Sequence, residues 1–577
     1  MLKEIDRIIK LPRIGEYSDS TRSLVKEKLK GKTITLRGVQ ADALYAIDSY
    51  KQGFFPIGVG HGKTIISVLS HLVTGSAKSL LFVPSNVVDQ LVRVDIPTIK
   101  EEFNVDFPVT NLQGVSHLDR HNVVSNSGLV IYPIGLVSQP DASDVLENSN
   151  AELIIIDECH NFSNSGSART KRLKKYWTEN PHVKLICLSG TITKKSLMDY
   201  HHLIVRALGE NCPLPKYFST TAKWDADLNS QGQYAKRFVA HKDILALAGS
   251  YNRLPLDVAR KTVRDRLNSA PGVIATEDQS VDCSIHINPI FLDTPEKLQT
   301  YLKDLDDLWV DPNGDEICDQ VVKTACEWQL SSGFYYKLTW PEGTSDWVLE
   351  AHEKKMEFYR ELRKWLTRRN KSGYDTPMLA IKALRREDPY MKKIKKFWDA
   401  FQSSHEDWMP ERERNVHWVS PFKVREALAW AQKNEKGIIW WRHDEIGKVL
   451  NDFFRAEYPG EFTYCPSGCK IEKLLEKDKI LLASESHGVG KNLQHYDNQL
   501  IIDVPRSGAT YEQLLGRTHR QGQKSDLVNC DILVGSEFDK KGLLTAIRDA
   551  HYIEDTTGQR QKLIFATWSY PEIFKGK

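Results

Sequence analysis

The chain of 577 residues lacks any apolar run long enough to cross a membrane. Its longest apolar stretches, such as Leu153–Ile156, have only the length of a β-strand. The residues after Met1 include early acidic side chains and no continuous apolar segment, which excludes a secretory signal. We therefore expect a cytoplasmic protein that is neither secreted nor inserted in a membrane.

Cysteine is scarce and scattered, with 9 residues in the whole chain. Such usage argues for a reducing compartment and against a framework of disulfide bonds. One close pair, Cys465 and Cys469, has no second pair to complete a zinc site. The sequence therefore does not favour structural zinc.

Net charge is small as well, because 79 Lys and Arg stand against 76 Asp and Glu, a difference of +3. Residues 351–400 depart from this balance, with 15 Lys and Arg against 7 Asp and Glu. The aromatic residues that interleave with these charges are Phe358, Tyr359, Trp365, Tyr374, Tyr390, Phe397 and Trp398. Two interpretations stay open: a nucleic-acid surface with cations for phosphates and aromatics for bases, or amphipathic helices with aromatic cores.

Short apolar runs alternate with helical patterns in two parts of the chain, residues 36–210 and 416–550. Apolar, β-branched runs that are each followed by a helix are typical of buried parallel strands in an α/β fold. The runs expected to be strands are 79–84, 128–132, 153–157 and 183–189 in the first part, and 437–441, 479–484, 499–504 and 527–534 in the second. We therefore expect two α/β lobes, each built on a parallel sheet.

The rest of the chain is assigned by its position relative to these lobes. Residues 1–35 are expected to form an N-terminal extension, and residues 551–577 a C-terminal tail. Residues 211–415 are rich in tryptophan and charge, and we expect a mainly helical region with one strand, Cys283–Leu292. No internal repeat and no low-complexity linker is present in the sequence.

A glycine-rich turn precedes an apolar helical run in the first lobe. Glycines let backbone N–H groups turn towards phosphates, and the helix that follows adds the positive end of its dipole. The residues expected to bind the phosphates of ATP are Gly58, Val59, Gly60, His61, Gly62, Lys63 and Thr64, with the Thr64 hydroxyl as a Mg²⁺ ligand. The complete phosphate-loop spacing is not met because Ile57 stands where a glycine is expected, and so short a pattern also arises by chance.

Two adjacent carboxylates, Asp157 and Glu158, end the apolar run that begins at Leu153. Carboxylates at the C-terminal edge of a parallel sheet can face a metal. We expect Asp157 to hold Mg²⁺ through water, and Glu158 to orient and deprotonate an attacking water. The alternative is an exposed acidic turn. It is less favoured because the Lys63-Thr64 turn, which this chemistry requires, lies upstream in the sequence.

Arg517 and Arg520 stand three residues apart near the end of the second lobe. On a helix they would share a face and could reach a γ-phosphate across a cleft between the lobes. The alternative is a basic helix on the surface.

In this order, these pieces resemble the superfamily 2 helicases, and their details look like the Swi/Snf branch of double-strand DNA translocases. The segment from Leu36 to Gln40 resembles the adenine-reading motif, which implies a nucleotide contact by Arg37 and Gln40. His519-Arg520-Gln521-Gly522-Gln523 resembles the branch-specific ending His-Arg-Ile-Gly-Gln, and Gly516 departs from the Asp of eukaryotic members. The resemblance covers about 36–205 and 416–545, and it leaves 211–415 unmatched.

The resemblance also implies roles for residues in the other motifs. The residues implied to couple ATP state to lobe movement are His160, Ser189 and Thr191. Those implied to contact nucleic acid are Pro84, Ser85, Tyr132, Ser486, His487 and Gly488, and those implied to contact the nucleotide from lobe 2 are Gly490 and Gln513.

The function implied by the resemblance is a DNA-dependent ATPase that uses ATP and Mg²⁺ and steps along double-stranded or branched DNA. It implies two RecA-like lobes and no membrane partner, and it leaves the protein partners unknown. The compact length favours a bacterial or phage enzyme. Two alternatives remain: a helicase that separates strands or migrates branches, acting on DNA or less readily on RNA, and an inactive ATP-binding scaffold in a replication or repair assembly.

Overall fold

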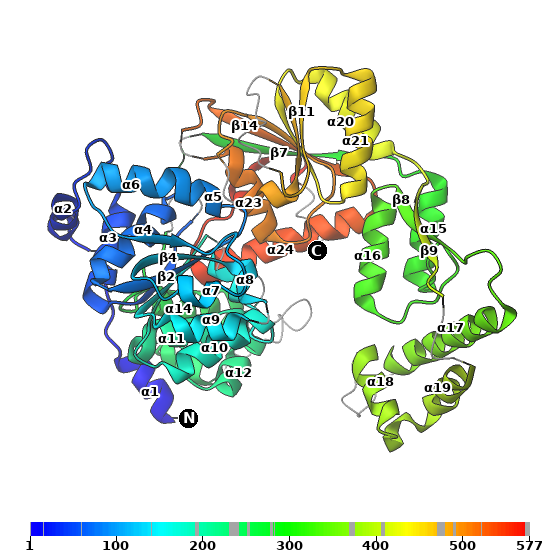
Figure 1. Cartoon of the computed structure of the whole chain (residues 1–577), viewed down its shortest axis with the longest axis horizontal. Coiled ribbons are helices and arrows are strands. Elements are labelled where there is room, and N and C mark those ends of the chain that lie inside the picture. Colours follow the sequence, from blue (N-terminus) through cyan, green and yellow to red (C-terminus); the bar gives the residue numbers. More distant parts are fainter. Residues whose placement is uncertain are drawn as a thin grey trace.

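Two parallel β-sheets, each covered by helices on both faces, organise the chain (Figure 1). The computed structural model describes residues 2–15, 17–58, 60–139, 141–190, 196–229, 242–250, 254–276, 281, 283–367, 376–404, 410–469, 479–488, 492–520 and 522–571. Within them one sheet has six strands and the other seven. The expected α/β fold with two RecA-like lobes is therefore confirmed.

The first sheet forms lobe 1 and has the strand order β1-β6-β5-β2-β4-β3, all parallel. Its strands are β1 (Gly53–Pro56), β2 (Lys78–Val83), β3 (Val109–Asn111), β4 (Gly128–Pro133), β5 (Leu153–Asp157) and β6 (Lys184–Ser189). Successive residues of a strand face opposite sides, so Leu80 and Phe82 enter one hydrophobic cluster, whereas Leu81 and Val83 enter another. Burial on both faces explains the continuous apolar runs in the sequence.

Helices on both faces complete lobe 1. The face of Leu81 packs against α2 (Asp19–Lys28), α3 (Gly38–Tyr50), α4 (Lys63–Thr74), α5 (Val88–Gln90), the π-helical turn η1 (Leu91–Asp95) and α6 (Ile96–Phe103). The face of Leu80 packs against α1 (Leu2–Lys10), α7 (Arg120–Val123), α8 (Ile134–Val137), α9 (Ala142–Ser149), η2 (Cys159–Phe162), α10 (Ala168–Glu179), η3 (Leu197–Asp199), α11 (His201–Leu208), η4 (Gly209–Asn211), α12 (Phe218–Leu228), α13 (Lys242–Leu247) and α14 (Leu256–Asn268). The expected extension 1–35 and the first part of the expected middle region therefore pack on lobe 1.

The second sheet forms lobe 2 and has the parallel order β11-β12-β10-β13-β14-β7-β15. Its strands are β7 (Ser284–Phe291), β10 (Gly437–Trp441), β11 (Phe462–Cys465), β12 (Ile480–Ser484), β13 (Asn498–Ile501), β14 (Leu527–Val534) and β15 (Thr567–Trp568). The helical segments of lobe 2 are α20 (Phe422–Lys433), α21 (Asp444–Glu457), η7 (Glu485–Gly488), α23 (Gly508–Thr518), α24 (Glu537–Thr557) and α25 (Lys562–Phe565). Helix α24 reaches lobe 1, where Asp555 pairs with Arg260 of α14 at 3.0 Å.

Strand β7 corrects the expected boundaries of the second lobe. It belongs to the region 211–415, yet it pairs with β14 along its whole length, from Ser284 opposite Leu527 to Phe291 opposite Val534. The expected tail, 551–577, likewise supplies β15, which pairs with β7 at the sheet edge. Parallel neighbours need not be adjacent in sequence, because a crossover separates them. The sequence pattern therefore predicted the strand correctly but not its sheet.

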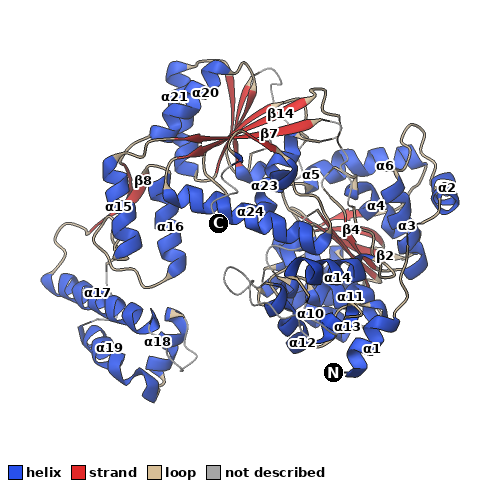
Figure 2. Ribbon diagram, turned by 180° about the vertical axis from the view of Figure 1, so that it is seen from behind, coloured by secondary structure: helices blue, strands red, loops and turns tan. Residues whose placement is uncertain are grey.

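An arm, residues 293–418, extends from lobe 2 on the opposite side from lobe 1 (Figures 1 and 2). Its base consists of α15 (Glu296–Asp307), α16 (Gln320–Ser331) and the antiparallel pair β8 (Phe334–Thr339) and β9 (Glu413–Trp418). Its tip is a three-helix module of α17 (Asp346–Thr367), α18 (Pro377–Arg385) and α19 (Lys392–Ser404), with η6 (Pro389–Met391) before α19. No helix in the described part of the chain is long and apolar enough to span a membrane.

Candidate functional site

The turn between β1 and α4 has the backbone geometry of an anion-binding loop. Gly60 and Gly62 have φ values of 91° and 74°, in the left-handed region that favours glycine. Gly62 comes directly before Lys63, the first residue of α4, so the free N–H groups of the helix face the turn. Val59 lies outside the described residues. The turn can therefore hold an anion at the positive end of α4.

Gly62 also allows close contact with a neighbouring side chain. A Cβ atom at this position would lie 2.2 Å from Nε2 of Gln40. We expect Gly62→Ala to weaken ATP binding strongly, because the turn must shift and must also adopt a left-handed conformation that costs about 1–2 kcal/mol. Titration with a fluorescent ATP analogue measures this loss.

Gly75 supplies the matched control, since it ends the same helix with φ 70° and a Cβ atom added there would meet nothing within 4 Å. Gly75→Ala should carry the left-handed penalty, seen as a lower free energy of unfolding, while ATP affinity stays at the wild-type value. Equal ATP affinities in the two variants would contradict the role of the turn in binding ATP.

Lys63 points back into the turn. Its Nζ donates hydrogen bonds to the carbonyl oxygens of Ile57 at 3.2 Å and Gly58 at 3.3 Å, and it lies 3.9 Å from Oε1 of Glu158. The side chain is therefore held between the phosphate-binding turn and the acidic end of β5. A phosphate in the turn would offer this ammonium a stronger acceptor than two carbonyl groups.

The side chains of Arg37 and Gln40 form hydrogen bonds with the backbone of the turn. Arg37 donates to the carbonyl oxygen of Gly60 at 2.8 Å, and Gln40 Nε2 donates to that of His61 at 3.1 Å. Gln40 Oε1 accepts from the backbone N–H of Arg37 at 2.9 Å, and the side chain of Gln40 is only 2% exposed. Both ends of the Gln40 amide are thus hydrogen-bonded within the protein, and the adenine contact expected of Gln40 stays a prediction.

Thr276 is a supporting residue that the sequence pattern did not reveal. Its hydroxyl oxygen accepts a hydrogen bond from the backbone N–H of Gly58 at 2.8 Å. The two residues are 218 positions apart, so no local signal links them. Gly58 is consequently anchored at the start of the turn.

The acidic pair is built at the end of β5. Asp157 is the last residue of the strand, and Glu158 follows with φ 59°, a left-handed conformation that turns its carboxylate away from the sheet. Glu158 Oε2 lies 3.2 Å from Nδ1 of His160 and 3.4 Å from the hydroxyl of Ser189, which donates to it. His160 and Ser189 are themselves 3.3 Å apart. The structure thus joins the Asp-Glu pair to two of the three expected coupling residues, and Thr191 lies outside the described residues.

The two carboxylates have opposite electrostatic environments. Burial raises the pKa of Asp157, and the neighbouring Glu158 raises it further. Burial also acts to raise the pKa of Glu158, but Lys63, His160 and Arg517 together hold this pKa well below its usual range. Glu158 therefore stays ionised, as a residue that accepts a proton must be.

Arg517 of lobe 2 faces this carboxylate across the gap between the lobes. The side chain is 5% exposed, and its Nε donates to the backbone oxygen of Gln513 at 3.0 Å. Burial and the nearby Arg520 lower the pKa of Arg517 to about 9, and Glu158 opposes this shift. Two buried guanidinium groups side by side are costly unless an anion lies between them.

Arg520 faces a different part of lobe 1. Burial lowers its pKa, Asp95 acts in the opposite direction, and Arg37 adds repulsion. The neighbouring residues of the His-Arg-x-Gly-Gln segment fix its position: buried His519 has Nε2 2.9 Å from the carbonyl oxygen of Cys283, and Gln523 donates to the carbonyl oxygen of Tyr496 at 2.8 Å. Arg520 is thereby held at the end of α23, next to lobe 1.

One cavity of about 380 Å³ brings these groups together. Its polar lining comes from lobe 1 through Gly60, Gly62, Lys63, Thr64, Asp95, Asp157 and Glu158, and from lobe 2 through Asn492, Arg517 and Arg520. Its apolar wall includes Ile34, Val87, Leu91, Val94 and Ile99. The other expected nucleotide contacts, Gly58, His61, Arg37 and Gln513, are not among the lining residues, and Gly490 lies outside the described residues.

The donor chemistry of this cavity fits a nucleotide with Mg²⁺. Thr64 offers a hydroxyl and Asp157 a carboxylate, the hard oxygen ligands that Mg²⁺ prefers. The turn and Lys63 provide donors for phosphates. The apolar wall can cover a flat base.

A second cavity, about 1050 Å³, lies between the lobes beside the first. It contains four of the six expected nucleic-acid residues: Pro84, Ser85, Ser486 and His487. The residues that sequence analysis missed here include Asn86, Asn111, Gln113 and Asn161. Asn86 donates to the backbone oxygen of Ser486 at 3.4 Å, and this polar contact bridges the groove between the lobes.

The other two expected nucleic-acid residues do not line this groove. Tyr132 is 1% exposed and packs against Phe82, with 4.9 Å between ring centroids. It lies on the face of β4 that points into the core, so its expected contact is corrected. Gly488 is buried, and a Cβ there would meet Leu514 at 2.7 Å, which explains the glycine by packing.

His160 connects the two cavities. It lines the groove between the lobes, and it also contacts Glu158 in the smaller cavity. Binding of a ligand in the groove can therefore affect the Glu158 carboxylate through the side chain of His160.

Residues 37–200 match the sequence model of the DEAD/DEAH box helicases. The match supports an ATP-hydrolysing helicase of superfamily 2. It covers most of lobe 1, including the turn, the Asp157–Glu158 pair and His160. No curated protein sequence matches the chain.

Proposed function

We propose that the chain is a DNA-dependent ATPase that translocates on double-stranded DNA in the manner of the Swi/Snf branch. The observation that carries this proposal is the cavity in which Lys63 and Glu158 of lobe 1 face Arg517 and Arg520 of lobe 2. A nucleotide held there would bridge the lobes, since its phosphates are attractive to cations on both walls.

The hydrolysis step follows from the positions of these residues. Lys63 and the turn hold the phosphates, and ionised Glu158 takes the proton of the attacking water. Arg517 and Arg520 neutralise the charge that develops on the transferred phosphoryl group. Mg²⁺, held by Thr64 and Asp157, would supply further charge neutralisation. Loss of the γ-phosphate weakens the bridge, so the lobes can separate.

Movement on DNA requires that the groove between the lobes changes with this cycle. Its lining residues come from both lobes, and opening or closing the lobes shifts the two sets relative to each other. The lining includes hydroxyl and amide side chains such as Ser85, Asn111 and Gln113, which suit sugar-phosphate contacts rather than base recognition. The Arg520 segment, with its resemblance to the Swi/Snf ending, supports duplex DNA as the track.

The test measures the ATPase rate with duplex DNA, single-stranded DNA, branched DNA and RNA as separate activators. We expect duplex DNA to give the largest stimulation, and displacement of a triplex-forming strand without separation of a forked duplex. Stimulation by RNA alone, or unwinding of the fork, would replace the proposed function with a strand-separating helicase.

His160→Ala should reduce the stimulation of ATP hydrolysis by DNA, because it removes the side chain shared by the groove and Glu158. We expect the stimulated rate to fall towards the rate without DNA. ATP hydrolysis assays with and without saturating duplex measure the ratio. His182→Ala, at an exposed histidine, is the control and should keep the wild-type ratio; an unchanged ratio in the His160 variant would remove this residue from the coupling path.

A further inference from the structure

The three-helix module at the tip of the arm has a core of its own. This core contains Phe358, Leu362 and Trp365 of α17, with Ala380 and Leu384 of α18 and Met391 and Ile394 beyond it. Trp398 and Phe401 of α19 pack against Phe358, with centroid distances of 5.3 and 6.2 Å. Most described aromatics of the basic segment 351–400 thus serve as core or pack against it, and they are not available to stack on bases.

The basic residues of the module lie outside this core. Six exposed cations are here called the basic face: Lys382 and Arg385 on α18, Arg386 directly after it, and Lys392, Lys393 and Lys396 on α19. Spacings of three and four residues keep those of each helix together on one side. The module therefore carries a concentrated positive charge on its surface.

This charge is mostly uncompensated among the described residues. Of the nearby acids, Glu387 pairs with Lys395 at 2.8 Å and Asp388 accepts from the backbone N–H of Tyr390 at 2.9 Å, so Asp399 of α19 is left against six cations. On α17 the pattern differs, since Lys354 and Lys364 pair with Glu350 and Glu361, each at 2.7 Å. Like charges gathered without partners repel one another, so an anionic partner would relieve the basic face.

We propose that the basic face binds the phosphate backbone of duplex DNA outside the groove between the lobes. This inference rests on the proposed function, because it assumes that DNA is the track. Lysine and arginine at an exposed surface neutralise phosphates without recognising bases, which suits a motor that must act on any sequence.

The base of the arm joins the module to lobe 2. Strand β7, which leads into the arm, belongs to the sheet of lobe 2. Ser332 donates to Asp503 at 2.7 Å, Arg442 lies 4.1 Å from the ring centroid of Trp328, and Lys541 pairs with Asp306 at 3.6 Å. These contacts connect arm and lobe at several points.

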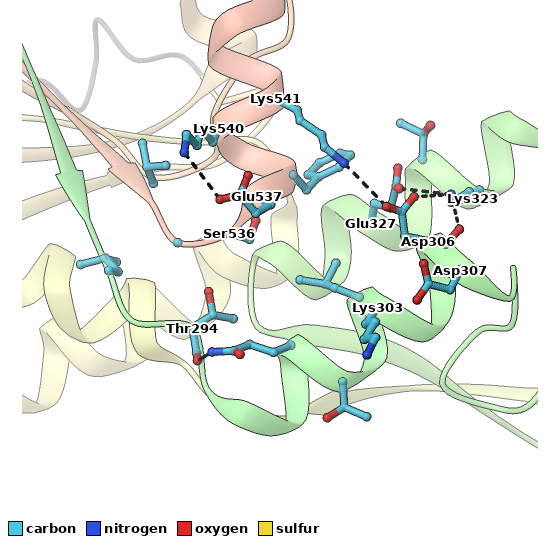
Figure 3. A pocket seen from close by; sticks show the side chains of 18 of the residues that line it. Thr294, Lys303, Asp306, Asp307, Lys323, Glu327, Ser536, Glu537, Lys540 and Lys541 are labelled. Carbon is cyan, nitrogen blue, oxygen red and sulfur yellow. Dashed lines mark hydrogen bonds and ion pairs between the residues drawn. The ribbon is translucent and has the colours of Figure 1, made fainter. Parts of the chain in front are cut away.

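Figure 3 shows the cleft of about 950 Å³ between α15, α16 and the start of α24. Asp306 is its central acid, since it accepts from Lys323 at 2.8 Å and also faces Lys541, while Lys540 pairs with Glu537 at 3.7 Å. The Lys541–Asp306 pair therefore crosses the junction between lobe 2 and the arm. Because the base of the arm is joined to lobe 2 in this way, we expect the module to follow lobe 2 and to carry the bound DNA when the lobes open and close.

The test compares two triple variants of the full-length chain with equal loss of charge. Lys392→Gln, Lys393→Gln and Lys396→Gln remove half of the basic face. Lys171→Gln, Lys223→Gln and Lys261→Gln, at exposed positions on α10, α12 and α14, form the control. Binding of a fluorescent duplex three helical turns long is measured over a series of salt concentrations.

We expect the module variant to bind this duplex roughly tenfold more weakly at low salt. The slope of log affinity against log salt should fall by about 0.9 for each lysine that contacts a phosphate. The control should follow the wild type. Equal affinities for wild type and module variant, or equal losses in both variants, overturn the inference.

Duplex length gives a second readout. A duplex of about one turn can occupy the groove but not reach the arm as well, so wild type and module variant should bind it equally. If the variant loses as much on the short duplex, the basic face is not a separate contact. Duplex-stimulated ATP hydrolysis by the wild type is measured in parallel: its absence refutes the proposed function, whereas its presence with unchanged binding of the variant refutes the module contact alone.

Discussion

Replacing Lys63 with alanine is expected to abolish ATP hydrolysis and leave the fold intact. The ammonium lies between the phosphate-binding turn and Glu158, where phosphates would meet it at close range in a buried site. Removing one such preorganised charge from a reacting centre typically costs about 10²–10³ in rate. The same change should also raise the pKa of Glu158, because Lys63 is the largest influence that keeps this pKa low.

Steady-state release of phosphate measures this loss, and thermal unfolding shows whether the chain stays folded. The hydrogen bonds lost are those to the carbonyl groups of Ile57 and Gly58, each worth about 0.5–1.5 kcal/mol. Lys171→Ala, at an exposed site on α10, is the matched control and should hydrolyse ATP at the wild-type rate. Hydrolysis that persists in a clean Lys63→Ala preparation would refute the assignment of the turn.

Sequence patterns predicted the parts of this fold in which local and tertiary preferences agree. The buried strands β2, β5, β10 and β12 are continuous apolar runs, because helices cover both faces of each sheet. The Asp157–Glu158 pair ends β5, and the lysine turn follows β1, a short strand that was not among the predicted runs. Carboxyl ends of parallel strands meet at one edge, so these residues come together by topology alone.

Features that depend on long-range pairing were not predictable in the same way. The strand 284–291 was visible as an alternating run, but nothing in its own residues shows that β14 is its neighbour. Thr276 supports Gly58 from a distant part of the chain for the same reason. Tyr132 shows a related difficulty: a motif gives the residue type, whereas burial decides which way the side chain points.

The charge excess in residues 351–400 also required the structure. Its sequence fitted both a nucleic-acid surface and an amphipathic helical bundle. The described chain contains elements of both, because Phe358 and Trp365 are buried in the core of the module while Lys392 and Lys393 are exposed. Charge and aromaticity alternate in sequence but separate in space, as they must on amphipathic helices.

Arg517→Ala and Arg520→Ala are expected to bind ATP and hydrolyse it very slowly. Both guanidinium groups lie on the lobe 2 wall of the cavity, opposite the turn that binds the nucleotide from lobe 1. An arginine finger stabilises the charge of the transition state and contributes about 10³–10⁵ in turnover. The affinity for ATP in the ground state should change much less, because the turn and Lys63 still bind the phosphates.

Single-turnover hydrolysis and binding of a fluorescent ATP analogue separate these two effects. Arg548→Ala, at an exposed position on α24, is the control and should match the wild type in both. Arg517→Lys tests geometry: it keeps the charge but loses the planar fork, so turnover should stay low. Loss of ATP binding in Arg520→Ala with an unchanged rate per bound nucleotide would place this arginine in substrate binding, and the two walls of the cavity would no longer need to act together.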